Sequence, residues 1–203
     1  ASYSRGMRLL SASGGVRTTV VEQAMQRAPV FTFDDPRAAR DFGRWVDENF
    51  EAIRAAAEAT TRFGKLVRIE QFAVAALRYL RFNFTTGDAA GQNMVGKATR
   101  AACEWIRASY PEPIDYMLSG NIDTDKKHSH INTLSSRGRR VVAEATIPDA
   151  LIQRLMGVDT ATLFHSRQKS NAGALLAGAA NNGAHAANAI AALFIATGQD
   201  VAN

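Results

Sequence analysis

The segment Ser119-Gly-Asn-Ile-Asp-Thr-Asp-Lys-Lys-His-Ser-His-Ile-Asn132 is the stretch on which the interpretation of this sequence depends. It places two adjacent lysines directly behind an aspartate and is otherwise rich in Asx, Gly and hydroxyl residues, so it is too polar to be core. Apolar segments at 114–118 and 140–147 flank it and are typical of strands. A polar loop held between rigid elements is where ligand-binding and catalytic groups usually lie. We therefore expect this loop to form the centre of a functional site.

The composition of the chain indicates a folded domain without a disulfide or a membrane helix in this stretch. The chain has 203 residues, 46% of them apolar, which is enough for a sizeable core in one large or two small domains. A single cysteine, Cys103, cannot form an internal disulfide, which favours a reducing, cytoplasmic location. The longest apolar run, 189–196, is far shorter than the roughly 20 residues of a membrane helix, so we expect no membrane contact within this stretch.

The charge pattern points to small phosphate-bearing ligands. The formal net charge is +5, but no cluster of Lys and Arg is long enough to indicate a nucleic-acid surface, so no nucleic-acid partner is expected. Dispersed single cations suit a basic soluble surface or small phosphate-bearing ligands. His128 and His130 could suggest a metal, but no third or fourth ligand is evident, and we expect none.

The segment 29–114 has the pattern of an independent unit. Alternating apolar residues predict strands at 30–33, 65–72, 77–84 and 114–118, with Val67 and Ile69 facing inward in the second. Helical spacing predicts one or two helices after Asp35-Pro36 and another that Asp88 caps. The resulting order, βαββαβ, is the ferredoxin-like arrangement. The same order describes RNA-recognition modules, but the aromatic strand 79–84 lacks the glycine of their motif.

The remaining segments, 1–28 and 115–203, are predicted to be mostly helical. Valines and Met25 at helical spacing over 16–25 predict a helix that Pro29 closes. A strand is expected at 140–147, followed by helices at 148–156, 159–168 and 184–197. The predicted fold class is therefore α+β, with a large, mostly helical domain (1–28 and 115–203) interrupted by a small domain (29–114).

Four blocks of this sequence carry a family resemblance. Ser119–Lys127, with Ile131-Asn132 and 138–148, resembles the SGN–TDKK–IN–GRG–VV–EA–IP block of 3-hydroxy-3-methylglutaryl-CoA (HMG-CoA) reductase. Three further blocks agree in the family's order: Ala1-Ser2 with Arg5-Gly6, Gly87-Asp-Ala-Ala-Gly-Gln-Asn-Met94, and Ala184-His-Ala-Ala-Asn188 through Gly198-Gln-Asp200. The resemblance runs the length of the chain, is closest to class I, and corresponds to the central part of the catalytic domain.

The resemblance implies a fold and an activity. The small domain would bind NADP and the large one the acyl-CoA, and the enzyme would use NADPH to reduce HMG-CoA in two steps to mevalonate and CoA. The family builds its site across a subunit interface, which implies a homodimer or homotetramer with a shared active site. NADPH rather than NADH is the family's cofactor, and the sequence itself does not fix this choice.

The resemblance also implies roles for single residues. Lys126 would stabilise the developing oxyanion, with Asp200 as its partner. The other implied positions fall into two groups. Substrate or CoA would be bound by Arg27, Ser119, Asp125, Lys127, Lys169, His185, Asn188, Ser2 and Arg5. The nucleotide would be bound by Arg8, Arg62, Asp88, Gln92, Asn93 and Met94.

The sequence departs from the family pattern at several points. The family's catalytic glutamate falls upstream of Ala1 and its catalytic histidine downstream of Asn203, so we expect the chain to be a piece of a longer protein. The family often has methionine where Gln92 stands, and His128-Ser129 replaces its usual Pro-Ala. These departures leave open an alternative, a non-catalytic or repurposed homologue that binds acyl-CoA or nucleotide without turnover.

Overall fold

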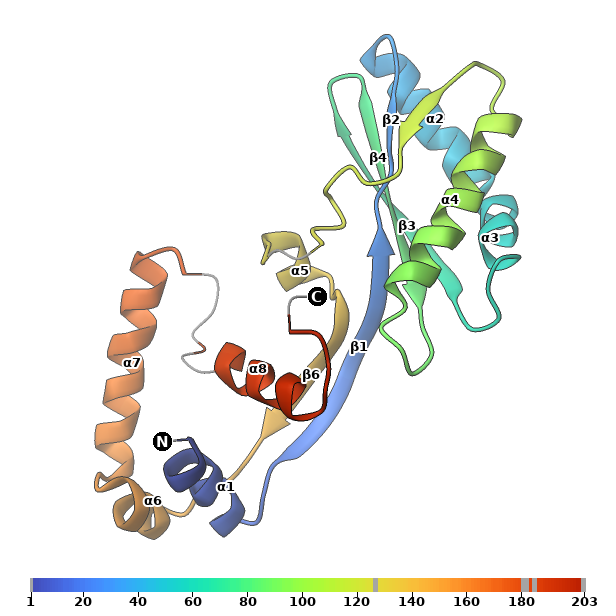
Figure 1. Ribbon diagram of the computed structural model, residues 1–203. Coiled ribbons are helices and arrows are strands. Elements are labelled where there is room, and N and C mark those ends of the chain that lie inside the picture. Colours follow the sequence, from blue (N-terminus) through green and yellow to red (C-terminus); the bar gives the residue numbers. More distant parts are fainter. Residues whose placement is uncertain (1, 126–127, 180–182, 184–185, 202–203) are drawn as a thin grey trace. The chain divides into compact units, whose positions relative to one another are not determined.

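The computed structural model describes residues 2–125, 128–179, 183 and 186–201 (Figure 1). It combines helices with a mainly antiparallel sheet, which confirms the predicted α+β class. The chain divides into two compact units. The first consists of Ala1–Thr19, His128–His130 and Val142–Asn203, and the second of Val20–Lys127 and Ile131–Val141. The predicted domain boundaries at 29 and 114 stay a prediction.

The sheet of the second unit is centred on β4 (Leu77–Thr85). β3 (Lys65–Val74) pairs with one edge of β4, and β2 (Val30–Thr32) pairs with the other and then with β5 (Asp115–Met117). The order of these four strands is therefore β5-β2-β4-β3. A register shift between Leu66 and Arg68 places Leu66 in the core and leaves Val67 52% exposed, so the predicted inward position of Val67 is wrong.

Three helices cover one face of this sheet: α2 (Pro36–Glu48), α3 (Phe50–Glu58) and α4 (Gln92–Ser109) (Figure 1). Asp35 caps α2 as predicted, accepting hydrogen bonds from the backbone N–H groups of Arg37 and Ala38 at 2.7 and 2.9 Å. Alternate residues of β4 point toward the helices and are fully buried. The apolar core they share comprises Phe31, Phe42, Val46, Ile53, Leu66, Leu80, Phe82, Phe84, Val95, Ala98, Ala102, Cys103 and Ile106.

The predicted helix at 16–25 is wrong, because this segment forms β1 (Arg17–Arg27). Its β-branched run Thr18–Val21 favours an extended backbone. The end of β1 pairs with β4, with Met25 opposite Phe84, and β6 (Gly138–Glu144) lies along it. Both partner strands come from distant parts of the chain, so local spacing could not reveal the pairing.

The first unit is mainly helical. Its helices are η1, a π-helical turn (Ser2–Met7), α1 (Arg8–Ala12), α6 (Asp149–Met156), α7 (Thr160–Leu176) and α8 (Ala186–Ala196). The predicted α6, α7 and α8 are confirmed, although α7 continues to Leu176. η1, α1 and α5 (His130–Leu134) were not predicted. Among the residues described, no helix is both long and apolar enough to span a lipid bilayer.

Candidate functional site

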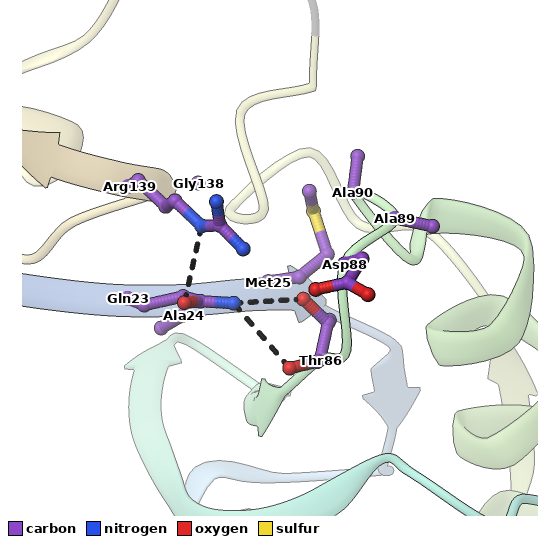
Figure 2. Close-up of a pocket in the computed structure, with 9 residues that line it drawn as sticks. All are labelled: Gln23, Ala24, Met25, Thr86, Asp88, Ala89, Ala90, Gly138 and Arg139. Atoms are coloured by element: carbon purple, nitrogen blue, oxygen red, sulfur yellow. Dashed lines mark hydrogen bonds between the residues drawn. The ribbon is translucent and has the colours of Figure 1, made fainter.

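Two adjoining cavities surround the loop 86–91, which joins β4 to α4 in the second unit. The first has a volume of about 250 Å³ and the second about 360 Å³, and Thr86, Asp88 and Ala89 line both. The wall of the first is completed by Gln23, Ala24, Met25, Ala90, Gly138 and Arg139 (Figure 2). The wall of the second is completed by Thr61, Phe63, Gly87, Gly91 and Met94.

The first cavity carries several polar side chains, and hydrogen bonds hold three of them in place. Gln23 Nε2 donates to Thr86 Oγ1 at 3.0 Å, and its Oε1 accepts from Arg139 Nε at 3.2 Å (Figure 2). Asp88 lines the same cavity and adds a carboxylate (Figure 2). A guanidinium, an amide and a carboxylate on one wall can bind phosphate and ribose groups.

The second cavity combines an apolar wall with a helix N-terminus. Phe63 and Met94 supply the apolar surface. α4 begins after Gly91, has no side-chain cap and carries no acidic residue in its first turn. Asp88 is therefore not the cap of α4, and that prediction is wrong. The first N–H groups of a helix have no intrahelical acceptors, and together with the helix dipole they favour an anion.

Gly91 is required by the geometry of this loop, and Gly91→Ala should destabilise the protein by about 1–3 kcal/mol. Its φ of +82° is a left-handed conformation, and a Cβ atom there would lie 2.5 Å from Thr86 Cγ2. Thermal unfolding measures the loss. Because Thr86 lines both cavities, the substitution should also alter their shape.

Gly173→Ala is the matched control for this substitution. Gly173 lies within α7, has no positive φ and would place its Cβ in open space. Alanine at such a helical position should stabilise by about 0.4–1 kcal/mol. Equal effects of the two substitutions would contradict the requirement for glycine at position 91.

The polar loop that opens the sequence analysis is anchored through two aspartates. Asp123 is fully buried, accepts from Arg27 Nη1 at 2.9 Å and lies 3.3 Å from Ser119 Oγ. Asp125 accepts from Arg137 Nη2 at 3.1 Å and from Gln92 Nε2 at 2.8 Å. Two fixed carboxylates thus anchor the segment 123–125.

This loop also contains strained backbone. Asn121 and Thr124 have φ values of +70° and +48°. A β-branched residue rarely adopts positive φ, and such strain persists only where the surroundings impose it, as functional sites often do. Beside this loop, the buried Nε of Arg27 has no hydrogen-bond partner among the described residues. A buried donor without a partner is unfavourable and rare in folded proteins, so this arginine is under an unusual constraint.

A layer of buried polar side chains supports the loop from the sheet. Arg81 is fully buried on the face of β4 opposite the helices. Its Nη1 donates to Glu70 Oε2 at 2.6 Å and its Nη2 to Asn132 Oδ1 at 3.2 Å. Gln26 Nε2 donates to Asn83 Oδ1 and to the carbonyl of Ser136 at 2.9 and 2.7 Å. The segment after the lysines is therefore tied to β1, β3 and β4.

The charges of this layer are stabilised by hydrogen bonds. Burial raises the pKa of Glu70, but hydrogen bonds from Arg81 and Asn83 outweigh it, so its pKa lies below the ordinary value of 4.5. The hydroxyl of Ser136 donates to Glu22 Oε2 at 2.7 Å and likewise lowers the pKa of Glu22. Both glutamates are therefore ionised near neutral pH.

The structure brings together several residues that the sequence singled out. Ser119 and Arg27 meet at Asp123, Gln92 meets Asp125, and Asp88 and Met94 line the second cavity. Two more predicted residues have exposed side chains and are adjacent in sequence to residues that line the second cavity. Arg62 stands between Thr61 and Phe63, and Asn93 is in the first turn of α4.

Other predicted positions belong to the first unit or lie outside the described residues. Ser2 is in η1, and Arg8 lines a cavity of about 470 Å³ with residues of η1 and α1. The side chains of four more are exposed: Arg5, Lys169, Asn188 and Asp200. Lys126, Lys127 and His185 lie outside the described residues. Within the described part of the chain, no three His, Cys, Asp or Glu side chains converge as a metal site would require.

Sequence reasoning missed several residues that shape these cavities and anchors. Gln23, Thr86 and Arg139 were hidden by the wrong helix at 16–25 and by their wide separation in sequence. Asp123 had a visible signal, because its charge lies two residues before the DKK motif, but the sequence did not show that it is buried. Arg137 lies ten residues after that motif, and nothing in the sequence linked it to Asp125.

A sequence model described as hydroxymethylglutaryl-coenzyme A reductase matches residues 1–203. The chain belongs to this family. The enzyme of this name from Halobacterium salinarum is 39% identical over the whole chain, and that from Pyrococcus horikoshii is 37% identical. The chain spans 50% and 49% of these relatives, about half their length.

Solved structures of reductases share the fold. The class II HMG-CoA reductase from Streptococcus pneumoniae, bound to NADPH in open conformations, has a TM-score of 0.55 with 15% identity. The similarity covers 75% of this chain and 39% of that one. A second structure from the same organism gives a TM-score of 0.52 with 16% identity. At this identity the comparison supports the fold alone.

Proposed function

We propose that the whole protein is an NADPH-dependent HMG-CoA reductase that converts HMG-CoA to mevalonate and CoA. The observation that carries the proposal is the buried Arg27–Asp123 pair, joined to the polar loop, in a chain matched by the family along its full length. The whole-chain match and the retained DKK segment favour this over a homologue that binds without turnover.

The small-domain assignment is supported by topology and by the cavities. A strand order of β5-β2-β4-β3 with helices on one face fits a ferredoxin-like unit, which we propose as the NADP-binding domain. The polar side chains of the first cavity, the apolar wall of the second and the uncapped N-terminus of α4 fit the parts of a dinucleotide. When bound, NADPH supplies the hydride.

The described residues would bind and orient the substrate. The side chain of Arg27 is oriented by Asp123, and its guanidinium would bind the carboxylate of the acyl group. Asp125, fixed by Arg137, offers a carboxylate to the substrate's tertiary hydroxyl. Lys126 follows directly and would stabilise charge on the thioester oxygen, with Asp200 of a neighbouring subunit as its partner in a homodimer or homotetramer.

A steady-state assay of the full-length enzyme tests the proposal. NADPH oxidation should depend on HMG-CoA and yield mevalonate and free CoA. Arg27→Lys should raise KM for HMG-CoA far more than KM for NADPH, because a lysine cannot reproduce the fork geometry of the guanidinium. NADPH and acyl-CoA binding with no product would instead identify a non-catalytic homologue.

We expect Asp200→Asn to cut kcat by about 10²-fold or more if its charge acts beside Lys126 in the assembled enzyme. The amide keeps the shape of the side chain, so sedimentation should show an unchanged assembly. For an exposed helix-end residue without such a role, the change would stay within about 0.5 kcal/mol. If the variant turns over like the wild type, Asp200 is not part of the active site. If turnover is lost and the subunits dissociate, Asp200 acts in the subunit interface.

A further inference from the structure

Gln92 lies between the second cavity and the polar loop of the second unit. It is the first residue of α4 and follows Gly91, which lines the second cavity together with Met94. Its side chain points to the polar loop, where Nε2 donates to Asp125 Oδ2 at 2.8 Å. One residue thus links the wall of a cavity to a carboxylate that adjoins the two lysines.

Asp125 is held from its other side by a fixed arginine. Arg137 Nη2 donates to Asp125 Oδ1 at 3.1 Å, while Arg137 Nη1 donates to the carbonyl of Gln26 in β1 at 2.9 Å. The side chains of Arg137 and Asp125 are only 12% and 24% exposed. Arg137 therefore holds Oδ1 from the sheet, and Gln92 holds Oδ2 from the start of α4.

The position of Gln92 depends in turn on the loop 86–91. A ligand in the two cavities contacts Thr86, Asp88 and Ala89, which line both. Because this loop leads directly into α4, such a ligand restrains the first turn of the helix and the amide of Gln92. The amide is neutral, so it can orient Asp125 without altering the charge balance of the Asp125–Arg137 pair.

We propose that Gln92 is a positioning residue that couples nucleotide binding to acyl-substrate binding through Asp125. The proposal rests on the proposed function, which assigns the cavities to NADP and Asp125 to the acyl group. Coupling of this kind is reciprocal: nucleotide raises the affinity for acyl-CoA by the same factor by which acyl-CoA raises the affinity for nucleotide.

Calorimetric titration of the full-length enzyme with NADP⁺, alone and with saturating HMG-CoA, measures the coupling. The two ligands do not react, because neither supplies a hydride. We expect the wild-type enzyme to bind NADP⁺ at least about 5-fold more tightly in the presence of HMG-CoA. Gln92→Met keeps the length of the side chain and removes the hydrogen-bond donor. In this variant HMG-CoA should change the NADP⁺ affinity by less than about 2-fold.

The control is Gln153→Met, the same substitution in α6, where the amide of Gln153 donates to Asp149 of the same helix. It should leave the coupling unchanged. In an Asp125→Asn background, Gln92→Met should have no further effect on the coupling, which a general loosening of α4 would not reproduce.

Three results would overturn the coupling role. The first is that HMG-CoA does not change the NADP⁺ affinity of the wild-type enzyme. The second is that Gln92→Met keeps the full wild-type coupling, and the third is that Gln153→Met loses as much coupling as Gln92→Met. A wild-type enzyme that binds neither NADP⁺ nor HMG-CoA would overturn the proposed function itself, and is distinguishable because each ligand is also titrated alone.

Discussion

Replacing Arg81 with methionine should lower the free energy of unfolding by about 3 kcal/mol or more. Arg81 is fully buried in β4 and donates to Glu70 at 2.6 Å and to Asn132 at 3.2 Å. Removing one partner of a buried ion pair typically costs about 3–5 kcal/mol, because the other charge is left uncompensated. Urea unfolding followed by circular dichroism measures the change.

Arg68→Met provides a control with the same carboxylate. Arg68 lies 3.7 Å from Glu70, but its side chain is 43% exposed. An exposed pair of this kind contributes about 0–1 kcal/mol, so this loss should be much smaller than that of Arg81→Met. Adding Glu70→Gln to Arg81→Met should recover part of the stability, because the uncompensated charge is removed. Equal losses for the two arginines would contradict the importance of burial.

The pH dependence gives an independent signature of the pair. The folded-state pKa of Glu70 is below its ordinary value of 4.5, so its stabilising contribution is complete above pH 4.5 and is lost as the pH falls through the folded pKa. In Arg81→Met the burial of Glu70 remains while its main donor is gone. The part of the fall in unfolding free energy at low pH that comes from protonation of Glu70 should therefore become smaller or change sign.

The local elements of the second unit could be predicted because their signals are local. Asp35-Pro36 specifies the start of α2, and the alternation of Leu80, Phe82 and Phe84 identifies the buried face of β4. The same alternation places Arg81 and Asn83 on the opposite face. A charged residue there would ordinarily be assigned to solvent, and only the distant residues Glu70 and Asn132 make its burial possible.

The segment 16–25 shows where local patterns fail. Its apolar residues fit a helical period, yet the partners that decide its conformation are β4 and β6, which lie far along the chain. The same limitation hid the first cavity, whose walls come from β1, the loop 86–91 and residues 138–139. The motif residues Asp125 and Gln92 could be identified by resemblance, whereas the hydrogen bond between them could not.

Lys126→Ala should reduce kcat by at least about 10²–10³-fold, the usual effect of removing one group that stabilises a developing oxyanion. The prediction rests on the family resemblance and on the two anchored aspartates at positions 123 and 125. Since charge would appear on the thioester oxygen only as reduction proceeds, a lysine in the proposed role would act mainly in the transition state. The affinity for NADPH should stay nearly unchanged, because the proposed nucleotide cavities are formed by other residues.

Two further variants separate this role from others. Lys97→Ala removes an exposed lysine of α4 and should leave turnover unchanged. Lys126→Arg keeps the charge but replaces a compact ammonium by a wider fork, so it should restore only part of the activity. Nucleotide fluorescence and single-turnover kinetics distinguish binding from chemistry. A large loss of NADPH affinity in Lys126→Ala would assign the lysine to the cofactor, and the anchored loop would then serve nucleotide binding instead of reduction.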